Sequence, residues 1–127
     1  MASELRVNTL KDASGNNSVG MSYVAEGTAK SWGAQITTSG TAGDTFNISS
    51  ITDLGSSENT ITFTSSFGSV NYSPPSSAGS PTNTSASNRI ATYYEMTSSS
   101  FKIKAFRADN AASTTFETSY AAFGDLA

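Results

Sequence analysis

The chain has 127 residues, of which 36% are hydrophobic and only 13% charged, and its formal net charge is -3 at pH 7. This acidic balance argues against nucleic acid as a partner, because affinity for phosphates depends on several Lys or Arg contacts. The absence of Cys and His excludes disulfides, thiolate chemistry, the usual Ser-His and Cys-His catalytic pairs, and zinc sites built from these residues.

A chain of this length is expected to form one domain around a single, modest hydrophobic core. No run of roughly 18 or more apolar residues occurs, so no membrane span is predicted. The N-terminal sequence MASELRVNTL lacks the apolar stretch of a signal peptide. We therefore expect the protein to stay where it is made, or to leave by a route that the sequence does not encode.

Residues 1–17 are predicted to form a short strand followed by a Gly-Asn turn. Leu5 and Val7 share one face of this strand, but the segment is too small to be a domain. A terminal segment of this kind usually needs something else to pair with or to wrap around. We therefore interpret residues 1–17 as an oligomerisation or attachment segment, and residues 18–127 as one domain.

Two strands are predicted next, because apolar residues alternate with polar ones at the period of two that half-buried strands show. Their apolar positions are Val19, Met21, Tyr23 and Ala25, and then Trp32, Ala34 and Ile36. Tyr23, Trp32 and the later Phe46 lie on apolar faces of this pattern and are predicted to be core residues. No window keeps an apolar stripe of period 3.6 with caps, so no long helix is predicted.

A hairpin is predicted over residues 44–64, DTFNISSITDLGSSENTITFT. Phe46 and Ile48 share one face of its first arm, but Ile51 falls on the opposite parity. Either a bulge at Ser49-Ser50 returns Ile51 to the same face, or the strand ends there. We favour the bulge, because an exposed Ile51 beside a sheet edge would invite pairing with other chains.

The segment 73–88, SPPSSAGSPTNTSASN, is predicted to be a long exposed loop, because it holds all three prolines and no large apolar residue. Its position and composition make it a candidate contact loop. The candidate contact residues are Pro74, Pro75, Ser80, Pro81, Asn83 and Asn88, together with Tyr93 just beyond the loop.

Three more strands are predicted towards the C-terminus. The alternating positions are Ile90, Thr92, Tyr94 and Met96, then Phe101, Ile103 and Ala105, then Phe116, Thr118, Tyr120 and Ala122. The adjacent Tyr93 and Tyr94 must face opposite sides of their strand, so one of them leaves the core. An exposed tyrosine beside a Ser/Asn-rich loop suits either stacking on a sugar or packing against a neighbouring subunit, and the sequence leaves both open.

Strands at this spacing, separated by turns rich in Gly, Ser, Asn and Asp, predict an all-β fold. We expect a small antiparallel β-sandwich or barrel-like domain.

Catalysis would have to rest on carboxylates, since a glycosidase needs only two, set about 5–9 Å apart. Six of them lie in turn-like contexts: Asp12, Asp44, Asp53, Glu58, Asp109 and Asp125. Asp and Glu are common in turns for solubility and geometry alone, so we expect no catalytic site. No D-x-D-x-D-G loop is present, so calcium is unsupported, and no metal or cofactor is predicted.

Four stretches, in order along the chain, resemble modules of tail fibres and related virion structural proteins of tailed bacteriophages, especially marine ones. LRVNTLKDASGNN (5–17) resembles the L-x-V-x-T-L-x-D-x-x-G leader of such proteins, and AKSW (29–32) resembles their A-K-A-W element. DTFNISSITDLGSSENTITF (44–63) resembles their D-S-F-N-V-S-S-V-T-D hairpin. The fourth stretch is the C-terminal pair SFKIKAF (100–106) and SYAAFGD (119–125), which resembles their closing strands.

This resemblance implies a virion structural module without catalytic residues, commonly trimeric, displayed on the particle after synthesis in the bacterial host. Leu5, Val7 and Leu10 of three chains would bury one another around the trimer axis, and are the candidate trimer contacts. The expected partners are further copies of the chain, other tail or capsid proteins, and host cell-surface glycan. The favoured interpretation is a tail-fibre or receptor-contacting module; the alternatives are a capsid decoration protein or head fibre, and a glycan depolymerase.

Overall fold

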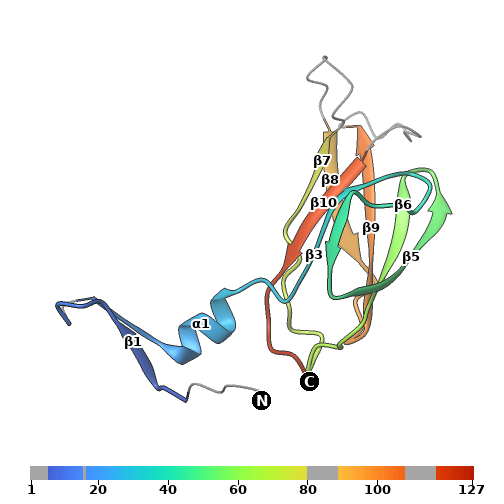
Figure 1. Cartoon of the computed structure of the whole chain (residues 1–127). Coiled ribbons are helices and arrows are strands. Elements are labelled where there is room, and N and C mark those ends of the chain that lie inside the picture. Colours follow the sequence, from blue (N-terminus) through green and yellow to red (C-terminus); the bar gives the residue numbers. More distant parts are fainter. Residues whose placement is uncertain (1–5, 16, 80–88, 108–116) are drawn as a thin grey trace.

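The computed structural model describes residues 6–15, 17–79, 89–107 and 117–127, and its fold is an antiparallel β-sandwich with one short helix (Figure 1). The all-β sandwich predicted from the sequence is thereby confirmed. The elements are β1 (Thr9–Lys11), β2 (Ser18–Gly20), α1 (Met21–Gly27), β3 (Ser31–Ile36), β4 (Asp44–Phe46), β5 (Ile48–Gly55), β6 (Glu58–Phe63), β7 (Ser76–Gly79), β8 (Arg89–Tyr94), β9 (Ser100–Arg107) and β10 (Glu117–Ala122).

Two four-stranded sheets form the sandwich. The first sheet has the strand order β4-β3-β10-β7, and the second has the order β5-β6-β9-β8. Between them lies a core in which Ile36 of the first sheet and Ile61, Phe101 and Ile103 of the second are fully buried. Each such side chain contributes about 1.5–3 kcal/mol by leaving water, so this interior accounts for much of the stability.

The predicted core positions on β6, β9 and β10 are confirmed. Ile61 and Phe63 are buried on β6, as are Phe101, Ile103 and Ala105 on β9. On β10 the buried residues are Thr118, Tyr120 and Ala122, whereas Phe116 lies outside the described residues. Strict alternation holds on these strands because each has one face against the core.

Two core aromatics come from the connection between β6 and β7, where the sequence pattern predicts no strand. The rings of Phe67 and Tyr72 stack with centroids 4.3 Å apart, and both rings meet Phe63 edge-on. Phe101 contacts this group and also meets Tyr120 edge-on at 4.9 Å. The connection therefore closes one end of the sandwich with an aromatic cluster instead of running over its surface.

The hairpin predicted over residues 44–64 is confirmed from Ile48 onwards, where β5 pairs antiparallel with β6. Its start is wrong, because the chain crosses from the first sheet to the second at Asn47. Phe46, predicted to be a core residue, ends β4 and is 52% exposed, whereas Ile48 begins β5 and packs against the core. Asn47 between them has a φ of 56°, a left-handed conformation that Asn tolerates better than most residues. This turn of the backbone places Phe46 and Ile48 on different sheets, so period two does not hold across it.

The bulge predicted at Ser49-Ser50 is confirmed. Ile48 pairs with Phe63 and Ser50 pairs with Thr62, so Ser49 is the extra residue. Its Oγ donates to the carbonyl oxygens of Thr62 and Phe63, at 3.1 Å in each case. The bulge lets Ile51, like Ile48, pack against the core.

The strand predicted over residues 19–25 is wrong beyond Gly20, where α1 begins. Met21 and Val24 are its partly buried residues, and they lie three apart on one helical face. Tyr23, predicted to be core, is 74% exposed. Met, Ala and Glu favour helix over strand, and this local preference outweighs the period-two alternation.

The long loop predicted over residues 73–88 is wrong at its start, because β7 pairs in register with β10 as an edge strand of the first sheet. Pro74 and Pro75 precede this strand, where a missing N–H disrupts no ladder bond. Residues 80–88 lie outside the described part of the chain.

Candidate functional site

Four apolar residues form a row across the outer face of the first sheet. Trp32 pairs with Phe46 on one side and with Ala121 on the other. The Ala121 N–H donates to the Pro75 carbonyl at 3.2 Å, which brings Pro75 to the end of the same line. We call Phe46, Trp32, Ala121 and Pro75 the apolar row.

The indole of Trp32 lies outside the core, so its prediction as a core residue is wrong. Ser31 and Gly33 on either side are buried, and a Cβ added at Gly33 would meet Tyr120 Cε1 at 3.2 Å. Neighbouring strand residues face opposite sides, so Trp32 points outwards and is half-buried.

The alternation of β3 is broken at Gln35, whose φ is 52°. This break explains why the core prediction for Trp32 is wrong. The pairing of β10 with β3 shifts between Thr118 and Tyr120, at the same level of the sheet. Because of this shift, Ile36 is buried although Trp32 and Ala34 are not. Gly33 was the available sequence signal, since a strand glycine often marks a close approach of neighbouring groups.

A shallow outer groove of about 480 Å³ lies along the apolar row. Its lining includes Trp32 on β3 and Pro75 beside β7, which lie on either side of β10. We call the small lining residues Ala34, Ser77, Ser119 and Ala121 the floor of the groove. The Ser119 Oγ accepts a hydrogen bond from the Gln35 N–H at 3.1 Å, which ties the groove to the irregular turn of β3.

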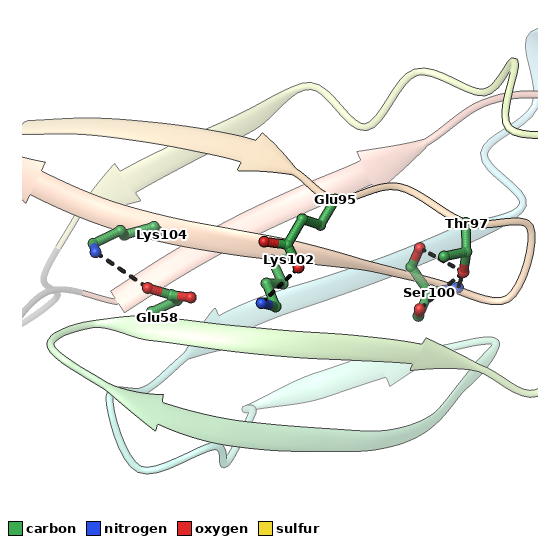
Figure 2. Close-up of polar contacts among 6 residues, drawn as sticks. All are labelled: Glu58, Glu95, Thr97, Ser100, Lys102 and Lys104. Carbon is green, nitrogen blue, oxygen red and sulfur yellow. Dashed lines mark hydrogen bonds and ion pairs between the residues drawn. The ribbon is translucent and has the colours of Figure 1, made fainter.

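The outer face of the second sheet is charged instead (Figure 2). Lys104 Nζ lies 3.1 Å from Glu58 Oε2, and Lys102 Nζ lies 2.7 Å from Glu95 Oε2. Lys102 also lies over the Tyr94 ring, 5.7 Å from its centroid. Beyond these pairs the face carries threonines of β5 and β6, as is usual for a solvated sheet surface.

The ionisable groups on this charged face interact and shift one another's pKa values. A hydrogen bond from Tyr94, followed by the nearby Lys104, lowers the pKa of Glu58. Burial and the neighbouring Glu58 raise the pKa of Tyr94, and Glu95 raises the pKa of Lys102. Each charge has a partner that stabilises its ordinary form, so these groups act as cross-strand ties on the sheet.

The turn between β8 and β9 uses its hydroxyl groups internally. Thr97 Oγ1 accepts hydrogen bonds from the N–H groups of Ser99 and Ser100, and lies 2.9 Å from Ser100 Oγ (Figure 2). This turn is therefore a structural feature and leaves little for a ligand.

The predicted contact residues that the structure describes differ in their exposure to solvent. Pro74 is buried, which contradicts its prediction as a contact residue, because the chain must turn inwards beside Tyr72 to reach β7. Pro75 is exposed and lines the outer groove, and Tyr93 is 40% exposed on the edge strand β8. Ser80, Pro81, Asn83 and Asn88 lie outside the described residues.

The N-terminal hairpin of β1 and β2, together with α1, stands apart from the sandwich (Figure 1). We call this segment, residues 6–27, the N-terminal arm. Leu10 pairs with Val19, and these two side chains are 43% and 39% exposed. Val7 is 36% exposed, and Leu5 lies outside the described residues.

Neither chemistry nor comparison assigns this chain to a known class of protein. Among the described residues, no group of three or more Asp or Glu side chains could hold a metal ion, and no helix is long and apolar enough to cross a membrane. No family model, no curated protein and no solved structure matches the chain. The function is therefore inferred from the apolar row, the outer groove and the N-terminal arm.

Proposed function

We propose that the chain is a non-catalytic structural protein of a tailed bacteriophage particle, a tail-fibre or receptor-contacting module that trimerises through its N-terminal arm. The single observation that carries this proposal is the arm itself, which stands apart from the sandwich and carries exposed apolar side chains. The resemblance of the four sequence stretches to phage fibre modules supports the same assignment.

The arm needs a partner for physical reasons. A two-stranded hairpin is marginally stable in water when it has nothing to pack against. Leu10 and Val19 form a cross-strand apolar pair on one face, yet each keeps about two fifths of its surface exposed. Three arms placed around an axis would bury this pair and Val7 against their copies, which is the arrangement that closed symmetry favours.

Light scattering on the purified chain tests the trimer. We expect a mass three times the 13.1 kDa of one chain, and the double variant Leu10→Ser, Val19→Ser should shift the protein towards monomer. The matched control is Lys11→Ser, because Lys11 is the neighbour of Leu10 in β1 and therefore points to the other face. A monomer at micromolar concentration for the unmodified chain contradicts trimerisation.

Mass spectrometry and density maps of purified particles test the location. We expect copies of the chain in the tail, at fibres that reach the host surface. Copies on capsid faces or vertices would contradict the fibre assignment and support the capsid decoration protein or head fibre instead. Degradation of host polysaccharide by the purified chain would contradict the non-catalytic assignment.

A further inference from the structure

The two outer faces of the sandwich differ in a way that solubility alone does not explain. The second sheet carries ion pairs and threonines on its outer face. The groove on the first sheet is lined by one indole, one proline, one tyrosine, one glycine, alanines and serines, without a charged side chain among its lining residues. A contiguous apolar strip with a small-residue floor is the usual mark of a binding surface.

We infer that the outer groove binds a neutral saccharide, with Trp32 as the stacking platform. A pyranose ring has a flat face of C–H groups and a rim of hydroxyls, so it needs an aromatic plane beside uncharged hydrogen-bonding groups. Trp32 supplies the plane, and Ser77 and Ser119 supply hydroxyls on the groove floor. For its biological setting this inference rests on the proposed function, because it names the ligand class for the receptor contact.

The hydrogen bonding of Ser119 leaves it suited to this role. Its Oγ already accepts the Gln35 N–H, which fixes the position of the oxygen. That bond does not use the hydroxyl hydrogen, so Ser119 keeps a donor for a sugar oxygen. The volume of about 480 Å³ lies within the range of small-ligand sites.

Phe46 extends the platform along the row. It is the direct cross-strand neighbour of Trp32, so the two Cβ atoms lie about 5 Å apart, and its ring is half exposed. Two aromatic side chains side by side favour a ligand that runs across the strands, as a short oligosaccharide would. A folded protein partner fits less well, because a stable interface covers about 800 Å² on each side and the apolar strip is one residue wide.

Trp32 is the only tryptophan of the chain, so its fluorescence reports on the groove directly. The experiment titrates the purified chain with neutral glucan, mannan and galactan oligosaccharides, with a uronate oligosaccharide as the charged comparison. We expect a saturable emission change with at least one neutral sugar, at a dissociation constant of about 1 mM or below. The uronate sugar should bind at least about tenfold more weakly.

Variants distinguish stacking on Trp32 from effects of substitution elsewhere on the surface. Sugar binding to each variant is measured by calorimetry. Trp32→Ala should abolish binding, and Ser119→Ala should weaken it about fivefold through the loss of one hydrogen bond. Because Ser119→Ala leaves the indole and the core in place, it tests the groove even if Trp32→Ala unfolds. The matched control is Lys102→Ala on the other outer face, which should bind within about twofold of the unmodified chain.

Three results would overturn the inference: no emission change with any neutral sugar up to about 10 mM, equal binding of the uronate sugar, or unchanged affinity in Ser119→Ala. An emission that shifts with protein concentration alone would also overturn it, because a second copy would then cover the groove. The titration uses purified protein, so its failure leaves the location in the particle to be decided separately by microscopy.

Discussion

The side chain of Asn47 is hydrogen-bonded to both main-chain groups of Ser65. Asn47 Oδ1 accepts the Ser65 N–H at 2.7 Å, and Asn47 Nδ2 donates to the Ser65 carbonyl at 3.0 Å. The same Nδ2 also donates to the Lys30 carbonyl at 3.0 Å. One side chain therefore joins the start of β3, the end of β6 and the point where the chain changes sheet.

Replacing Asn47 should destabilise the fold more than replacing a typical half-exposed polar residue does. In Asn47→Ala three hydrogen bonds are lost and a residue poorly suited to φ of 56° is introduced. We expect the free energy of unfolding to fall by about 2–4 kcal/mol, measured by urea denaturation. Asn47→Gly is the control, because it loses the same bonds but tolerates the φ, so it should cost about 1 kcal/mol less. A loss below about 0.5 kcal/mol in Asn47→Ala contradicts the assignment.

Deleting Ser49 should leave the faces of the second sheet unchanged. Ser49 is the extra residue of the bulge, so without it Ile48 and Ile51 stand two positions apart in a regular strand and still share one face. We expect a loss of about 1 kcal/mol in unfolding free energy from the bonds of Ser49 Oγ alone. Ser49→Ala is the control, because it keeps the residue count, loses the same bonds and should also cost about 1 kcal/mol. A deletion that costs over about 2 kcal/mol more than Ser49→Ala would show that Ile51 has left the core and that the bulge is not a simple one-residue insertion.

Stability should fall in alkali because of the buried Tyr72. Burial raises the pKa of Tyr72 from 10.0 to about 12, so above pH 10 the unfolded chain loses this proton before the folded chain does. The stability that burial of the neutral form provides is fully present below pH 10 and is lost as the pH rises towards 12. Burial raises the pKa of Tyr120 as well, which adds to the same trend.

Urea midpoints measured across this alkaline range test the effect. Tyr72→Phe loses the hydrogen bond from its hydroxyl to the Ser100 carbonyl, so it should be less stable than the unmodified chain at neutral pH by about 1 kcal/mol. The difference in unfolding free energy between the two proteins should narrow above pH 10, because Phe does not ionise. A difference that stays constant over this pH range would contradict the role of tyrosine burial.

Stability should also fall in acid through Glu58. A hydrogen bond from Tyr94 and the nearby Lys104 lower the pKa of Glu58 below 4.5, so its contribution is present above that pH and is lost as the pH falls through the lowered value. Glu58→Gln should be less stable than the unmodified chain at neutral pH, with the difference shrinking in acid. Thermal melts of both proteins over this range give the comparison, and Tyr94→Phe should weaken the acid dependence. A difference that does not change with pH would show that Glu58 contributes no charge-dependent stability.

The sequence alone determined the parts of the fold that follow from regular alternation. On β6, β9 and β10 one face meets the core and the other meets solvent, so residues such as Ile61, Ile103 and Tyr120 are recognisable from period two. The bulge at Ser49 was recognisable too, because a single residue breaks the parity between Ile48 and Ile51.

Only the tertiary structure decided the outer groove and the arm. A positive φ at Gln35 and at Asn47 breaks the alternation without leaving a clear trace in the residue pattern, and these two breaks turn Trp32 and Phe46 outwards. Phe67 and Tyr72 join the core from an irregular connection, where no periodicity exists to reveal them. Sequence patterns report local repetition, whereas the apolar row combines residues from three strands and from the segment before β7, which only folding brings together.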